Sequence, residues 1–269
     1  MNEAISVRGL TVSYGALHGI DLDVPRGQVT GLIGPNGAGK STLMKVLAGI
    51  IPYGGSAKKS GREISKLTRA ERQKTGYAGE CSLPPSLTLS QTERVLSRIF
   101  SEWSGKTFYG YAASFGLPLD LKTGEFSSGM KAKAALAAAL SHGADTLLLD
   151  EPTSGMDIAA REQVLDILYD YMQDETHTLL VSSHITSDLE RLCDNVALIG
   201  GGEIALYGEK DELLSRYAVV DATGGAHAVR TLRREYGVRA LVERKDLRDA
   251  DNAERVSLDD LILFFVKGE

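Results

Sequence analysis

A glycine-rich segment near the N-terminus has the residue types that hold phosphate groups. Glycines let such a loop turn its backbone N–H groups onto phosphate oxygens, and the Lys40 ammonium can reach the outer phosphates. Ser41 can supply a hydroxyl ligand to Mg²⁺. A plain glycine turn has no need of a lysine followed by serine. The segment satisfies the G-x-x-x-x-G-K-[ST] pattern and consists of Gly34, Pro35, Asn36, Gly37, Ala38, Gly39, Lys40, Ser41 and Thr42.

A second candidate for chemistry is a pair of carboxylates, Asp150 and Glu151, which ends the apolar run Leu147–Leu149. Because side chains alternate along a strand, the two carboxylates are expected to point in different directions. Asp150 can then hold the Mg²⁺ shell. Glu151 can accept a proton from an attacking water, a role that typically contributes about 10²–10⁴-fold to a rate.

The elements that must position these residues alternate between strands and helices. Helical spacing of apolar residues predicts helices over 41–49 and 158–172, one on each side of the carboxylate pair. The pattern indicates an α/β fold with a mainly parallel sheet and an N-terminal antiparallel part. The expected strands are Ala4–Val12, Ile20–Val24, Val29–Ile33, Thr146–Leu149 and Thr178–Val181.

Two further regions differ in pattern from this core. About residues 82–140 are helical and rich in aromatic residues and alanine, which predicts a helical insertion. The runs Asn195–Ile199 and Glu203–Tyr207 flank three glycines and predict an edge hairpin. After Tyr217 the periodicity changes, so residues 218–269 are expected to form a small α+β appendage.

Composition limits the possible partners. The chain has 269 residues, a net charge of −6 and a pI near 5.5, which disfavours general binding to nucleic acid. The basic run over 58–74 is interrupted by Glu63 and Glu71 and is interpreted as a solvated face. No apolar run approaches the roughly 20 residues that cross a bilayer, and the N-terminus has no secretory pattern. A cytoplasmic location is therefore expected.

The segment Phe126-Ser127-Ser128-Gly129-Met130-Lys131, shortly before Asp150, resembles the signature motif of ABC ATPases. In that family the motif closes over the γ-phosphate of ATP held by another subunit. The resemblance therefore implies that Ser127, Ser128 and Gly129 act across a dimer interface. A serine-glycine helix start agrees with this role, because it offers backbone donors and a hydroxyl to an anion.

Other elements occur in the order that this family shows. The resemblance places Tyr14 where adenine stacks, and Glu80 at the usual glutamine of the Q-loop, beside the nucleotide and its metal. It makes residues 154–157 the D-loop, ending in Asp157. It also makes His184 the switch histidine, able to hydrogen-bond the terminal phosphate.

The resemblance covers about residues 1–217 and includes four departures. Ser128 stands where glycine is usual, Met130 where glutamine is common, Gly79 where proline often precedes the Q-loop, and Glu80 where glutamine is usual. Ser128 adds a side chain close to the implied phosphate contact. Nucleotide binding is thus more firmly predicted than the geometry of dimer closure.

The arrangement is most similar to ATPase subunits of bacterial export-type transporters whose permease is a separate chain. This likeness implies a homodimer, or a heterodimer with a related ATPase subunit, that binds ATP and Mg²⁺. It also implies a position on the inner face of the cell membrane, held there by the permease. Two alternatives remain open at this point: an ABC ATPase without a transporter, and a regulatory module that binds nucleotide without useful turnover.

Overall fold

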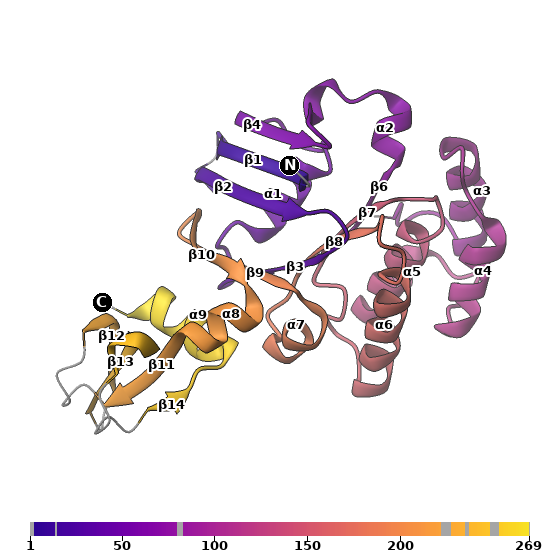
Figure 1. Cartoon of the computed structure of the whole chain (residues 1–269). Coiled ribbons are helices and arrows are strands. Elements are labelled where there is room, and N and C mark those ends of the chain that lie inside the picture. Colours follow the sequence, from indigo (N-terminus) through magenta and orange to yellow (C-terminus); the bar gives the residue numbers. More distant parts are fainter. Residues whose placement is uncertain are drawn as a thin grey trace.

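The computed structural model describes residues 3–13, 15–79, 83–221, 227–234, 237–247 and 253–268. In these ranges the strands form three sheets, of four, six and four strands. Figure 1 shows the antiparallel N-terminal sheet above the central sheet, the helices α3 and α4 at one side, and the C-terminal elements at the opposite end. The α/β fold class predicted from the sequence is confirmed.

The six-stranded sheet has the order β10-β9-β3-β8-β7-β6. All neighbouring pairs are parallel except β9 and β10, which form the expected hairpin. Strands β3 and β8 are buried along their whole length, because helices or the second sheet cover both faces. The strands are β3 (Val29–Ile33), β6 (Thr75–Ala78), β7 (Thr146–Asp150), β8 (Thr178–Ser182), β9 (Asn195–Gly200) and β10 (Glu203–Glu209).

The N-terminal sheet, of order β2-β1-β4-β5, is antiparallel. Helix α1 (Lys40–Leu47) packs between this sheet and the central one, with Leu43 and Met44 fully buried in a cluster that includes Leu148 and Leu180. The phosphate loop is therefore fixed at one end of a rigid helix. The strands are β1 (Glu3–Thr11), β2 (His18–Pro25), β4 (Gly54–Lys59) and β5 (Arg62–Glu63).

The basic run over 58–74 is not wholly a solvated face. Lys59 is only 8% exposed, and its Nζ donates to Asp145 Oδ1 at 2.9 Å and to the carbonyl oxygen of Lys74 at 2.8 Å. The solvated interpretation was wrong for this residue, because a long-range carboxylate compensates its buried charge. The run continues through the short 3₁₀ helix Ile64–Lys66 and helix α2 (Arg69–Gln73).

The helical insertion forms the side of the molecule next to β6. Helix α5 packs closely because most of its alanines are buried against the core, Ala134 and Ala137 fully. In the described residues from 83 to 140 no strand occurs beyond a single bridge between Thr88 and Lys122, as the sequence predicts. The elements are α3 (Leu89–Ile99), α4 (Gly105–Ser114), a 3₁₀ turn (Thr123–Glu125) and α5 (Ser128–Ala139).

Helices α6 (Ile158–Tyr171) and α7 (Thr186–Leu192) lie on the face of the central sheet that α5 also covers. Val164 and Leu168 of α6 pack with Leu179 of β8 in one apolar cluster. Helix α6 follows the end of β7, and α7 follows the end of β8. The starts of both helices are thus held at the sheet edge where Asp150 and Glu151 lie.

After helix α8 (Lys210–Arg216) the chain forms a small sheet of order β12-β13-β11-β14, with helix α9 on one face. Phe264 of α9 packs in the same cluster as Val196 and Leu198 of β9, and Glu190 accepts a hydrogen bond from Leu258 N at 3.2 Å. The helix therefore contacts both the appendage and the core, while the division after residue 217 stays a prediction. The elements are β11 (Tyr217–Asp221), β12 (Ala228–Arg234), β13 (Gly237–Glu243), a 3₁₀ turn (Arg244–Asp246), β14 (Glu254–Arg255) and α9 (Leu258–Lys267).

Within the described residues, we find no helix with both the length and the apolar character needed to span a bilayer.

Candidate functional site

The phosphate loop wraps around its own lysine. Residues 34–39 turn from the end of β3 into α1, and Lys40 is only 6% exposed at the start of that helix. Its Nζ donates to the carbonyl oxygens of Gly34, at 2.7 Å, and Pro35, at 3.2 Å. Phosphate oxygens can replace these neutral acceptors with a stronger, charge-assisted contact. The lysine is thus placed where an anion entering the loop would meet it.

At two positions of the loop only glycine fits, because atoms of other segments of the same polypeptide lie too close for a Cβ. A Cβ at Gly39, where φ is +108°, would lie 2.6 Å from Leu17 Cδ2 and 2.8 Å from the carbonyl oxygen of Ala16. A Cβ at Gly34 would collide with the carbonyl oxygen of Ile199. The exposed part of the loop, Pro35–Gly37, therefore lies between two buried positions, Gly34 and Gly39, that have no room for a side chain.

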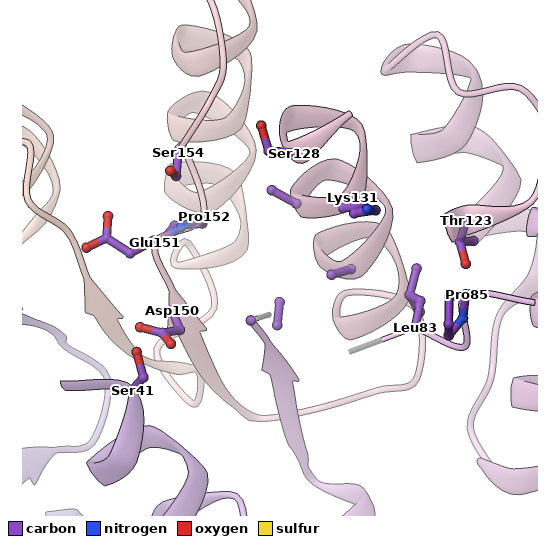
Figure 2. A pocket seen from close by; sticks show the side chains of 14 residues that line it. Ser41, Leu83, Pro85, Thr123, Ser128, Lys131, Asp150, Glu151, Pro152 and Ser154 are labelled. Atoms are coloured by element: carbon purple, nitrogen blue, oxygen red, sulfur yellow. The ribbon is translucent and has the colours of Figure 1, made fainter. Parts of the chain in front are cut away.

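Asp150, at the end of β7, is oriented by a serine of the neighbouring strand. Ser182 Oγ donates to Asp150 Oδ1 at 2.6 Å and accepts from Glu151 N at 3.1 Å. Figure 2 shows the Asp150 carboxylate beside Ser41, with Glu151 turned to a different side. The sequence predicts this separation from strand alternation, but β7 ends at Asp150, and Glu151 has left the strand in a left-handed conformation. Hydroxyl and carboxylate oxygens with a phosphate are ligands that suit Mg²⁺, so these two residues fit that ion.

Glu151 faces His184. The His184 Nδ1 lies 2.6 Å from Glu151 Oε2, a contact that places the proton on Nδ1 because a carboxylate only accepts. Glu151 has φ +53°, a left-handed conformation that costs on the order of 1–3 kcal/mol for a residue with a side chain. Such strain is typical of functional positions. Side chains from the segments that follow β7 and β8 are thereby brought together, 33 residues apart in sequence.

The start of α5 packs against the D-loop of the same chain. Ser127 caps the helix by accepting from Met130 N at 3.2 Å. A Cβ on Gly129 would lie 2.7 Å from the carbonyl oxygen of Gly155, and a Cβ on Gly155, where φ is +70°, would collide with Ser128 Oγ. The side chain that departs from the family pattern at position 128 is accommodated because residue 155 is glycine.

A cavity of about 570 Å³ separates these groups. Ser41, Asp150 and Glu151 line one side, and Ser128 and Lys131 of α5 line another (Figure 2). The structure thus brings the phosphate loop and the carboxylate pair together. It leaves Ser128 across an open space from Ser41.

Three other predicted site residues are Tyr14, Glu80 and Asp157. Tyr14 and Glu80 lie outside the described residues. Asp157 accepts from Ala160 N at 2.8 Å and so caps α6, which places the end of the D-loop. The sequence reasoning missed Ser182. Its position two residues before His184, at the end of a buried strand parallel to β7, is the signal that could have found it.

Comparison with known proteins shows the family of this chain. Residues 17–154, more than half of the chain, match the family described as ABC transporter. The chain belongs to the ABC transporter family. It is 32% identical over 254 residues to the daunorubicin/doxorubicin resistance ATP-binding protein DrrA of Streptomyces peucetius, covering 87% of this chain and 76% of that protein. It is 34% identical over 221 residues to the lantibiotic transport ATP-binding protein SrtF of Streptococcus pyogenes, covering 77% and 91%.

Solved structures show the same fold. An ATP-binding subunit of an ABC transporter superposes with a TM-score of 0.68 at 26% identity, over 78% of this chain and 91% of that one. A dimeric bacterial ABC transporter cassette superposes with a TM-score of 0.67 at 21% identity, over 76% and 98%. This member of the ABC transporter family is an ATPase subunit that binds nucleotide and drives transport by ATP hydrolysis, as the sequence predicts.

Proposed function

We propose that this subunit works as one half of an ATPase pair, identical or mixed, in which two ATP molecules are held between the subunits. Lys40 and Ser41 grip the phosphates from one side, and Ser127, Ser128 and Gly129 of the facing subunit complete each site. Tyr14, Glu80 and Asp157 belong to the same proposed nucleotide site. The family relationship supports this arrangement, as does the cavity that lies between Ser41 and the signature segment of one chain.

The proposed chemistry rests on one observation, the pairing of Glu151 with His184 beside Asp150. Glu151 accepts a proton from the attacking water, and His184 orients that carboxylate and reaches the terminal phosphate. Ser41 and Asp150, with Glu80 beside them, would hold Mg²⁺, which supplies charge stabilisation to the phosphates when bound. Lys40 stabilises negative charge on the outer phosphate oxygens.

Opening and closing of the pair would move a separate transmembrane permease. The signature segment and the D-loop are in contact within the chain, so a phosphate bound at one site can influence the loop that follows Glu151 of the other. Similar proteins carry the names lantibiotic transport, Nod factor export and drug resistance ATP-binding proteins. We therefore assign the outward direction to this transporter, with the subunit on the inner face of the membrane.

Replacement of the proposed base tests this function. The variant Glu151→Gln keeps the size of the side chain and removes its basicity, so hydrolysis should slow by about 10²–10⁴-fold. An ATP-stabilised dimer should appear on gel filtration, because closure no longer leads to hydrolysis. The control Glu203→Gln changes an exposed carboxylate on β10 and should leave both measurements unchanged. Unaltered hydrolysis in Glu151→Gln, with no dimer, would remove Glu151 from the mechanism.

A further inference from the structure

A buried carboxylate outside the nucleotide-binding residues joins three segments next to Glu151. Asp188, in α7, is only 3% exposed. Its Oδ2 accepts from Thr153 Oγ1 at 2.9 Å, and its Oδ1 accepts from Arg161 Nε. Arg161 also donates to Ser187 Oγ at 2.7 Å. We call Thr153, Arg161 and Asp188 the D-loop clamp.

The clamp encloses the D-loop and lies close to the proposed base. Thr153 follows Glu151 by two residues, and Asp188 follows His184 by four. Residues 154–157 lie between Thr153, which directly precedes them, and Arg161, in the first turn of α6, and both of these residues bind the same carboxylate. Glu151 and His184 are therefore connected twice, by their own contact and through the Thr153–Asp188 bond.

Burial strengthens the hydrogen bonds of the D-loop clamp. Thr153 is 4% exposed and the side chain of Asp188 is 5% exposed, so water does not compete for the contact. A hydrogen bond to a charged group in such surroundings is stronger than one at the surface. An ion pair of Arg161 with Asp188 compensates the buried charge.

We propose that the D-loop clamp is a positioning device for hydrolysis: Asp188, through Thr153, fixes the loop after Glu151 relative to the loop that carries His184. The inference rests on the proposed roles of Glu151 and His184. A displacement of about 1 Å in a reacting group can cost on the order of 10²-fold in rate. Loosening the clamp should therefore lower kcat while leaving phosphate binding by the Lys40 loop intact.

Thr153→Val tests the clamp with the least disturbance of the fold. Valine keeps the shape of threonine and the Arg161–Asp188 ion pair, but it removes the hydroxyl donor. We expect kcat to fall about tenfold, with the Kd for ATP changed less than about twofold. A second variant, Asp188→Ala, removes both acceptor oxygens and should lower kcat at least as much. The double variant should be no slower than Asp188→Ala alone, because both changes remove the same Thr153–Asp188 bond.

The matched control is Glu162→Gln. Glu162 pairs with Arg191 and links the same two helices, α6 and α7, but its side chain is 46% exposed and its hydrogen bonds go to Arg191 rather than to Asp188 or Thr153. It should leave kcat unchanged. Melting temperature, measured for every variant, separates positioning from a purely structural role, which would lower the melting temperature and leave the kcat of the folded protein unchanged.

Measuring Glu151→Gln in parallel distinguishes the two proposals. If it slows hydrolysis whereas Thr153→Val and Asp188→Ala do not, the clamp has no positioning role and the proposed base stands. If Glu162→Gln lowers kcat as much as Thr153→Val, general coupling of the helices explains the result and the clamp is again overturned. If Glu151→Gln itself is as active as the unaltered protein, the proposed function fails first.

Discussion

The phosphate-loop edge of the central sheet and the C-terminal appendage are built from different interactions. At the sheet edge a buried lysine rests on backbone carbonyl oxygens, and Glu151 adopts a left-handed conformation. In the appendage the buried side chains are apolar, such as Leu241 and Phe264, and each described ion pair has at least one partner that is exposed to solvent. Figure 1 shows β11 and α9 at the far end of the molecule from α3.

This difference distinguishes the residues that carry out the chemistry from the residues that stabilise the fold. Buried polar groups and strained backbone cost free energy, and such strained or perturbed residues cluster at functional sites. Apolar burial, by contrast, is the main source of stability. Substitutions at the sheet edge should therefore change ATP turnover more than stability, and substitutions in α9 should do the reverse. Measurements of turnover and stability on the same variants test this contrast.

Lys40→Ala should have the largest effect. It removes the cation of the phosphate loop, so ATP hydrolysis should fall by about 10³-fold or more. Its contacts in the free protein are to two neutral carbonyl oxygens, so unfolding by denaturant should change little. ATP hydrolysis and urea unfolding measured on the same preparation check both statements. Activity that survives the change would remove the loop from the proposed site and leave a regulatory binding role open.

Phe264→Ala should show the opposite behaviour. Phe264 is 2% exposed and packs between the appendage sheet and β9, so its truncation should cost about 3–5 kcal/mol of unfolding free energy. The turnover of the molecules that remain folded should be unchanged. The matched control is Phe265→Ala, one residue further on and only partly buried, which should cost less. Loss of ATPase activity without loss of stability would break the contrast between the two regions.

The sequence predicted the parts of this fold that depend on local pattern. Strand β3 was predicted with the bounds that the structure shows, because a short apolar run before a glycine turn has few other interpretations. The phosphate loop followed from residue types alone. Asp150 and Glu151 were expected on different sides because of strand alternation, and they do point apart, but Glu151 does so from a left-handed conformation just after β7.

Contacts between distant segments were beyond the sequence. Lys59 was read as solvated because its partner Asp145 lies 86 residues away. Glu151 and His184 were both predicted as site residues. The short distance between their side chains, however, depends on the pairing of β7 with β8. The clamp residues Thr153, Arg161 and Asp188 each have an ordinary explanation in sequence, as a turn residue or an exposed helix charge. Only the folded structure shows that their side chains are hydrogen-bonded to one another.

The smallest effect is expected at Glu243, on the surface of the appendage. Hydrogen bonds from Lys245 and Arg216 hold the pKa of its carboxyl below the ordinary value. A carboxylate with a lowered pKa stabilises the fold above its unfolded pKa, near 4.3, and loses that contribution as the pH falls through the folded value. Glu243→Gln should therefore lower the melting temperature slightly at neutral pH and low salt, and not at all at acidic pH.

Salt provides the check on this last effect. At about 1 M ionic strength the Debye length is about 3 Å, so the surface charges are screened and the difference between Glu243→Gln and the unaltered protein should vanish. Glu203→Gln, on an exposed strand of the core, is again the control. A large, salt-independent loss in Glu243→Gln would show that the appendage depends on a polar contact in the way the sheet edge does, and the contrast between the two regions would no longer hold.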